Sequence, residues 1–269
     1  DGSYGLHPTI QEGSICGRGI AELQCTEGEV RLMGVAGGPS IPQSGLQLTL
    51  DASNSKSYGG SGTTWSDLSG NGRDFTFTAS PTYNSSGSDS SFDTIRANGP
   101  NANTFGIEAA SGYTIVLVAL QDALNNESAF KFPMGDGAGT DARGIFAHCS
   151  WGNGVVYFDT NGSTSTASSG GRVNTSGDGN FGTNDITHYA FTKSINGATQ
   201  TIYKDGVNVA QGTNRGPGVL LSAHPVTFGG DEQYLDGWDA KMYYILVYNR
   251  ELAATEVMQI YESMRGRLD

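Results

Sequence analysis

Closely spaced hairpin signals in the second half of the chain restrict the folds that it can adopt. Residues 144–159, GIFAHCSWGNGVVYFD, read as two strands around a Gly-Asn-Gly turn. Residues 188–210, HYAFTKSINGATQTIYKDGVNVA, read as three strands that turn first at an Asn-Gly pair and then at an Asp-Gly pair. Such dipeptides between strand-forming runs favour tight hairpins between antiparallel strands. The pattern therefore predicts an antiparallel β protein.

Further strand signals arrive at short intervals from residue 46 onward. Leucines alternate over residues 46–50, as in a half-buried strand. Residues 113–120, YTIVLVAL, are apolar on both faces, which predicts a central strand covered on each side. Pro133 in AFKFPM, residues 129–134, predicts an edge strand or a bulge. With residues 225–230 and 238–249, we expect about ten to fourteen strands, arranged as a two-sheet sandwich or jelly roll.

Trp65 precedes the turn-prone residues 69–72, Ser-Gly-Asn-Gly. The glycines allow a tight turn with positive φ directly after the Trp65 strand. Asp67 is placed to accept hydrogen bonds from the turn amides. We expect Trp65 to cover the sandwich end while Phe75 and Phe77 enter a sheet face, so this stretch is predicted to be a structural corner rather than a binding site.

The two ends of the chain differ from this β pattern. Residues 1–44 carry one short strand signal and a Gly/Pro-rich linker. We predict that they form an extended N-terminal arm, which docks on the main domain, residues 45–269, or on another subunit. A flexible tail is the alternative. Residues 251–268 predict a C-terminal α-helix, capped at Thr255 or a neighbour and ended by Gly266. The apolar stripe of this helix consists of Val257, Ile260, Tyr261 and Met264.

Composition excludes several classes of partner. Fifteen basic and 27 acidic residues give a net charge of −12. An acidic surface repels DNA, RNA and anionic lipid, so we expect no nucleic-acid binding. No apolar run is long enough for a transmembrane helix, so we expect no membrane insertion. The acidity serves either solubility or calcium binding in Asp-rich loops. The three cysteines contain no CxxC spacing, which argues against a zinc ribbon.

Two long stretches resemble a known family. Residues 46–78, LQLTLDASNSKSYGGSGTTWSDLSGNGRDFTFT, resemble the opening strands of concanavalin A-like, laminin-G-like jelly-roll domains, and residues 240–268, AKMYYILVYNRELAATEVMQIYESMRGRL, resemble the closing strand and terminal helix. Thr94 departs from the glycine that family members usually carry in a Phe-Asp-Gly segment. The resemblance implies a concanavalin A-like all-β sandwich. Residues 50–70 are most similar to versions in the virion proteins of tailed phages.

The sequence lacks the spacing of several known catalytic motifs. Glycosidases of this fold carry Glu-x-Asp-x-x-Glu on one strand, and the chain lacks that spacing. The acidic residues within 231–239 are interrupted by glycine and read as a loop. The four histidines show no metal-binding spacing, and no G-x-S-x-G occurs. We therefore expect no enzyme, although catalytic carboxylates that meet across the fold stay an open alternative.

The hairpin at residues 144–159 and two loops carry candidate ligand-binding residues. Sugar recognition needs an aromatic face together with amide and carboxylate groups for the hydroxyls. The candidate carbohydrate-binding residues are Trp151, Asn153, Tyr157, Asp159, Asn161 and Tyr234. The alternative is an ordinary hairpin with one exposed aromatic. We expect no cofactor to be required; Ca²⁺ is the one candidate metal, with Asp136 and Asp231 as its candidate ligands, and each also reads as a plain turn aspartate.

These patterns lead to one hypothesis and two rivals. The hypothesis is a non-enzymatic virion surface protein, a capsid decoration or fibre module, that contacts other virion or capsid subunits through residues 1–44, forms a homo-oligomer and binds surface glycans weakly. The first rival is a secreted or cell-surface, extracellular lectin module. The second is a glycoside hydrolase with dispersed catalytic carboxylates.

Overall fold

The computed structural model divides the chain into two compact units, residues 1–38 and 39–269. The residues that it describes are 23–26, 29–32, 40–93, 96–107, 111–124, 127–132, 144–160, 171–175, 185–195, 199–213, 224–230 and 238–268. In the first unit, β1 (Leu23–Thr26) and β2 (Glu29–Leu32) form an antiparallel pair. The sequence indicated a single strand in this region, so the pair is a correction.

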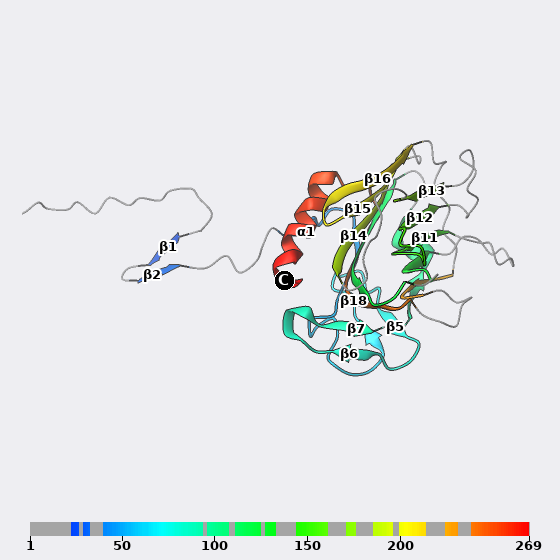
Figure 1. Ribbon diagram of the computed structural model, residues 1–269. Helices are drawn as coiled ribbons and strands as arrows, with labels where there is room; N and C mark the ends of the chain where they lie inside the picture. Colours follow the sequence, from blue (N-terminus) through cyan, green and yellow to red (C-terminus); the bar gives the residue numbers. More distant parts are fainter. Residues whose placement is uncertain are drawn as a thin grey trace, which may run out of the picture. The chain divides into compact units, whose positions relative to one another are not determined.

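The second unit is a sandwich of two eight-stranded sheets, which confirms the predicted fold class (Figure 1). The sheet on which the helix packs, here the helix-covered sheet, has the order β16-β15-β14-β9-β18-β7-β6, with β3 also paired to β18. All of its pairings are antiparallel. Its strands are β16 (Val207–Thr213), β15 (Thr199–Lys204), β14 (Ile186–Lys193), β9 (Tyr113–Gln121), β18 (Ala240–Tyr248), β7 (Ser91–Asp93), β6 (Thr82–Asn84) and β3 (Leu46–Asp51). Strand β9 lies between β14 and β18 and is almost wholly buried, so the predicted central strand is confirmed.

The other sheet, here the second sheet, has the order β13-β12-β11-β10-β17-β8-β5-β4 and is also antiparallel. Its strands are β13 (Gly171–Asn174), β12 (Tyr157–Thr160), β11 (Ile145–His148), β10 (Phe130–Phe132), β17 (Pro225–Phe228), β8 (Ala97–Asn101), β5 (Phe75–Phe77) and β4 (Thr64–Trp65). Strand β10 pairs with β11 on one side and β17 on the other. The predicted edge position was therefore wrong. Pro133 itself lies outside the described residues, so the alternative of a bulge stays a prediction.

The described strands outnumber the sequence-based expectation because several are very short. Strand β4 has two residues, and β5, β6, β7 and β10 have three each. Such runs are too short for an alternating pattern to stand out. Two short 3₁₀ helices, η1 (Gly87–Asp89) and η2 (Ala102–Phe105), complete the described connections.

The predicted corner at Trp65 is confirmed. The indole is fully buried between the sheets and stacks on Phe77, with 5.8 Å between ring centroids. Oδ1 of Asp67 accepts hydrogen bonds from the amides of Thr49 (3.0 Å) and Ser69 (2.8 Å). The turn itself differs from the expectation: residues 66–74 form a longer loop between β4 and β5, and its glycines 70 and 72 adopt φ of 87° and 67°. The carboxylate, rather than a tight turn, organises this loop.

Helix α1 (Ala254–Leu268) packs on the outer face of the helix-covered sheet, where it buries Val257 and Ile260 completely. The helix continues through Gly266, so the predicted stop was wrong. A Cβ at that position would meet no atom within 4 Å, so the residue is tolerated there without a packing role. Of the two predicted possibilities for the N-terminal cap, the structure shows the neighbour of Thr255: the Ala253 amide donates to the Glu256 carboxylate at 2.9 Å, and Thr255 lies inside the helix.

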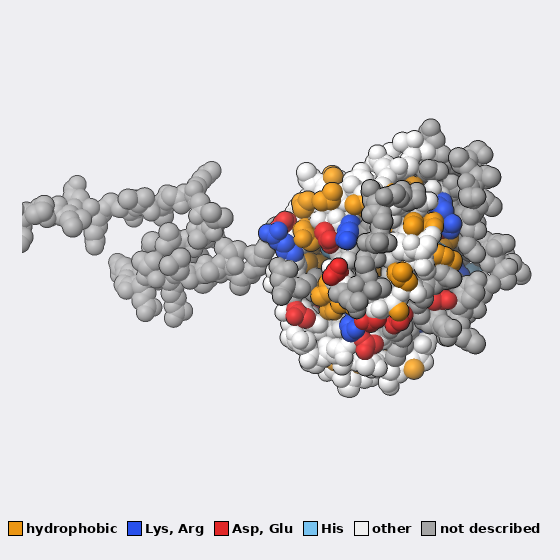
Figure 2. Space-filling model, in the orientation of Figure 1, with side chains coloured by type: hydrophobic (Ala, Val, Ile, Leu, Met, Phe, Trp, Pro, Cys, Tyr) orange, Lys and Arg blue, Asp and Glu red, His pale blue; other side chains and the backbone are white. Residues whose placement is uncertain are grey.

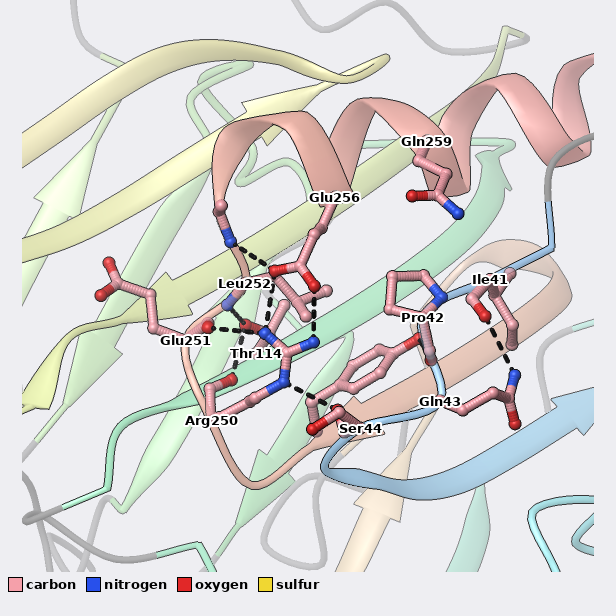
Figure 3. A network of polar contacts seen from close by, with 12 residues as sticks. Ile41, Pro42, Gln43, Ser44, Thr114, Arg250, Glu251, Leu252, Glu256 and Gln259 are labelled. Carbon is pink, nitrogen blue, oxygen red and sulfur yellow. Dashed lines mark hydrogen bonds and ion pairs between the residues drawn. The ribbon is translucent and has the colours of Figure 1, made fainter.

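Residues 40–44 are held against the helix and the last strand (Figure 3). The Tyr248 hydroxyl donates to the carbonyl of Pro42 at 3.0 Å, and Nε of Arg250 donates to the carbonyl of Ser44 at 2.7 Å. The same guanidinium forms a bidentate ion pair with Glu256, at 2.8 and 2.6 Å. The strand, the helix start and the entering chain are thus joined at one corner of the sandwich. The docking role predicted for residues 1–44 stays a prediction.

Charged side chains of both signs and apolar side chains are interspersed on the face of the sandwich that Figure 2 shows. Within the described ranges, no helix has the length and apolar character needed to cross a membrane.

Candidate glycan-binding face

The register of the second sheet aligns one row of side chains across all eight strands. In each strand at least one sequence neighbour of the row residue belongs to the core between the sheets, so the row itself points away from the core. The row consists of Thr64, Thr76, Asn98, Thr227, Lys131, Phe146, Asp159 and Arg172. Its side chains are exposed at Thr64 and Thr76, and buried at Phe146 and Asp159. The outer face of this sheet therefore changes character from one end to the other.

At the β11–β13 end, a neighbouring row of His148, Tyr157 and Asn174 lies beside the first. We use the name β11–β13 face for the outward group at this end of the sheet and the loop that joins β11 to β12. Its members are Phe146, His148, Trp151, Asn153, Tyr157, Asp159 and Arg172. The structure thus brings together four of the predicted carbohydrate-binding residues.

Aromatic rings form the floor of the β11–β13 face. Trp151 meets His148 edge-on, with 4.5 Å between ring centroids and an interplanar angle of 80°. Tyr157 stands at 81° to Trp151, at 6.3 Å. Phe146 and His148 are buried, whereas Trp151 and Tyr157 are partly exposed. The two accessible rings therefore form a right-angled corner supported from beneath by two buried rings.

A turn at the tip of the hairpin sets the position of Asn153 beside this corner. The Gly154 amide donates to the Trp151 carbonyl at 2.7 Å, and Gly154 adopts a φ of 76° that glycine accommodates without strain. Oδ1 of Asn153 accepts from the Val155 amide at 3.1 Å, while its Nδ2 donates to the Tyr157 hydroxyl at 3.0 Å. The exposed amide is thus held in one orientation at the edge of the aromatic corner.

An ion pair closes the other side of the β11–β13 face. Asp159 is fully buried, and its two oxygens accept hydrogen bonds of 2.6 Å each from Nε and Nη2 of Arg172. The hydrogen bonds with Asp159 raise the pKa of the Arg172 guanidinium above its ordinary value. The guanidinium carbon also lies 4.7 Å from the centroid of the Tyr157 ring. Asp159 thus holds the arginine over the tyrosine, and its direct contact with a sugar stays a prediction.

The remaining predicted site residues lie outside the described residues: Asn161, Tyr234 and the calcium candidates Asp136 and Asp231. Sequence reasoning missed Arg172, Phe146 and His148. The alternation in GRVN, residues 171–174, indicates that Arg172 and Val173 face opposite sides of a strand, but only the pairing with β12 reveals its partner. Within the described part, no three or more His, Cys, Asp or Glu side chains are grouped to hold a metal ion.

The comparisons with known proteins agree with this fold. Residues 126–258 match the sequence model of the Concanavalin A-like lectin/glucanases superfamily. The matched range begins just before β10 and ends in α1, so it includes every residue of the β11–β13 face. Residues 126–258 are therefore similar to this superfamily, and the two-sheet sandwich has the concanavalin A-like fold. No curated protein sequence matches the chain.

Solved structures of low sequence identity share the fold. A mutant of Trypanosoma rangeli sialidase displaying trans-sialidase activity superimposes with a TM-score of 0.60 at 17% identity, covering 85% of this chain and 34% of that one. The binding domain of Paraclostridial Mosquitocidal Protein 1 gives 0.60 at 14%, covering 81% and 52%. The binding domain of Botulinum Neurotoxin DC, solved in complex with SialylT, gives 0.57 at 12%, covering 83% and 52%. The chain thus spans about a third to a half of these proteins.

Proposed function

We propose that this domain is a non-catalytic carbohydrate-binding module whose ligand lies against the β11–β13 face. The observation that carries the proposal is the right-angled pair of partly exposed rings, Trp151 and Tyr157, with the Asn153 amide fixed beside them. A pyranose presents an apolar ring face and a rim of hydroxyls. Stacking on an aromatic ring and hydrogen bonds from an amide suit these two parts of the sugar.

The state of Asp159 favours binding over turnover. Glycoside hydrolysis generally needs two carboxyl groups on either side of the glycosidic bond, about 5 to 9.5 Å apart. In the β11–β13 face, Asp159 is buried and both of its oxygens are engaged by Arg172. A carboxylate held in this way is poorly placed to deliver a proton or attack an anomeric carbon. The ion pair therefore supports a binding function, and a glycoside hydrolase is the rival proposal.

Substitution of the accessible tryptophan tests the proposal. In Trp151→Ala, affinity for a glycan bound by the wild type should fall about tenfold or more, since buried aromatic anchors dominate most binding sites. Val207→Ser is the matched control, because Val207 is an exposed apolar residue on β16 of the other sheet, 56% accessible. Binding is measured by glycan array and calorimetry. Unchanged affinity in Trp151→Ala would place the glycan elsewhere.

Turnover and metal dependence are tested in the same preparations. Incubation with a panel of polysaccharides should release no reducing ends, whereas release that is lost on substitution of a carboxylate would favour the hydrolase.

We expect EDTA to leave glycan affinity unchanged, because no cofactor is proposed for the β11–β13 face. A loss that added Ca²⁺ restores would instead support the calcium candidates Asp136 and Asp231.

We further propose that the module is displayed on a virion surface, as a capsid decoration or fibre domain. The likeness of residues 50–70 to virion proteins of tailed phages supports this setting, and residues 1–44 are the segment proposed to contact other subunits. A secreted or cell-surface lectin is the alternative. Cryo-electron microscopy of intact particles decides between them: density for the sandwich supports the virion, and a particle without the chain contradicts it.

A further inference from the structure

The charge on the β11–β13 face depends on one ion pair. Arg172 is 26% exposed, whereas the Asp159 carboxylate that it contacts has no accessible surface. Both contacts measure 2.6 Å, the separation of a tight charge-assisted pair. The positive charge that reaches the surface of this face is therefore compensated directly beneath it.

This compensation weakens the attraction of the face for an anionic ligand. A sialic acid carboxylate that approached Arg172 would meet the positive guanidinium and, behind it, the buried negative charge of Asp159. Asp159 already occupies the Nε–Nη2 edge of the guanidinium, so an incoming anion is restricted to the Nη1–Nη2 end, where it shares Nη2 with the buried carboxylate. Charge interactions are strong where water is excluded, so the buried carboxylate adds appreciable repulsion.

The same arrangement suits hydroxyl groups. Nη1 lies on the side of the guanidinium away from the edge that Asp159 occupies, where it can donate to a sugar hydroxyl. The Asn153 amide supplies a further polar group, and Trp151 and Tyr157 supply the apolar surfaces. The whole chain carries a net charge of −12, which disfavours the approach of polyanionic glycans over longer distances.

From these contacts we infer that the β11–β13 face selects uncharged sugars over sialylated and other acidic glycans. This inference rests on the proposed glycan-binding function and adds the charge class of the ligand. It separates this chain from a structure of similar fold, the toxin binding domain solved in complex with SialylT. Shared fold does not transmit ligand specificity, which resides in the side chains of the site.

The experiment uses the full chain and an array of matched oligosaccharide pairs that differ only in a terminal sialic acid. The wild type should bind the neutral member of a pair about tenfold more tightly than the sialylated member. Its affinity for the neutral member should change less than about twofold between ~0.05 and ~0.5 M NaCl, because no net charge attraction is involved. Equal or tighter binding of the sialylated member would overturn the inference and leave the proposed glycan-binding function standing.

Two variants examine the ion pair itself. Asp159→Asn removes the compensating charge but keeps a hydrogen-bonding group of similar size, so the ratio of sialylated to neutral affinity should rise about tenfold. Arg172→Lys retains the charge pair, so it should weaken binding of the neutral member and keep the neutral preference. Both ratios are measured within one preparation, so a partly unfolded fraction does not alter them.

Three further outcomes of these experiments would also decide for or against the inference. An unchanged ratio in Asp159→Asn, with near-ultraviolet circular dichroism matching the wild type, would overturn the inference. If Asp159→Asn does not fold, the wild-type pair ratio and its salt dependence decide alone. Absence of binding to any glycan on the array would remove the proposed function, and the inference with it.

Discussion

The outer faces of the two sheets differ in how they use the same alternation of side chains. On the helix-covered sheet, outward residues such as Val118 and Leu246 are apolar and lie beneath α1. On the second sheet, the corresponding outward residues include Arg172, Asp159 and Tyr157. Helix α1 covers one face, whereas on the other the side chains of Trp151, Tyr157 and Arg172 are partly exposed. The contrast indicates which side of the sandwich is available for recognition.

One histidine on each sheet shows how the surroundings of the two faces differ. His148, on the second sheet, has Nδ1 3.1 Å from the carbonyl oxygen of Glu127 and packs edge-on against Trp151. His188, on the helix-covered sheet, is 3% exposed and packs against Tyr261 of α1 at 5.8 Å. Within the described residues, neither ring nitrogen of His188 has a hydrogen-bond partner. The polar face satisfies its imidazole, and the apolar face holds one that is difficult to charge.

The largest expected effect comes from breaking the ion pair of the polar face. Arg172→Met leaves the fully buried Asp159 carboxylate without its cation, and we expect a loss of about 4 kcal/mol in the free energy of unfolding. The double variant with Asp159→Asn should recover most of that loss, because the uncompensated charge is removed. Urea denaturation measures both. A single variant as stable as the wild type would mean that solvent reaches Asp159.

The apolar face should respond to pH through His188. Burial lowers the pKa of this imidazole from 6.5 to about 4. Between these values the unfolded chain binds a proton that the folded chain does not, so stability is full above about pH 6.5 and falls as the pH drops towards 4. The linked loss is about 3 kcal/mol.

His188→Leu supplies the comparison for this prediction. Thermal unfolding of both proteins from pH 7 to pH 4 should show a much shallower decrease in the variant over this interval, since leucine takes up no proton. Parallel decreases in the two proteins would assign the acid sensitivity to other groups.

A smaller effect should follow from trimming the helix contact. Ile260→Val removes one methylene from a fully buried side chain, at a cost of about 1 kcal/mol. Val207→Ala on exposed β16 is the control and should change stability by less than about 0.5 kcal/mol. Equal effects of the two substitutions would contradict the close packing of α1 on the sheet.

The smallest expected effect has the opposite sign. Gly266→Ala adds a methyl group where no atom lies within 4 Å, inside the helix, so the variant should gain about 0.5 kcal/mol. Chemical denaturation resolves this gain if averaged replicates bring the error in the free energy of unfolding to about 0.2 kcal/mol, because surface substitutions change stability by only a few tenths of a kcal/mol. Destabilisation would instead support the helix stop that the sequence suggested.

The fold could be predicted largely because its information is local. Alternation and Asn-Gly or Asp-Gly turns identify β14, β15 and β16, and a continuous apolar run identifies β9. The errors arose where long-range pairing overrides a local signal. Pro133 suggested an edge or a bulge, yet the preceding strand β10 is paired on both sides. Gly266 suggested a helix end, yet the helix continues to Leu268.

In the candidate site too, residues close in sequence could be predicted together, whereas a partner on another strand could not. Trp151, Asn153 and Tyr157 could be grouped in advance because one hairpin carries all three. Arg172 could not, since its partnership with Asp159 depends on the register between β12 and β13, and the sequence of residues 161–170 between these strands does not fix that register. The sequence therefore predicted the accessible rings of the face but neither its arginine nor the buried rings of Phe146 and His148.

The corner at which residues 40–44 join the sandwich determines its presentation. The carbonyls of Ser40, Pro42 and Ser44 accept hydrogen bonds from Gln259 of α1, from Tyr248 at the end of β18 and from Arg250, respectively. All three donors lie on the helix side of the domain. The aromatic corner at Trp151 lies on the opposite sheet, facing outward. A larger structure attached to the domain through this entering chain would therefore lie on the side of the helix-covered sheet. The proposed glycan-binding face would then point away from the attachment.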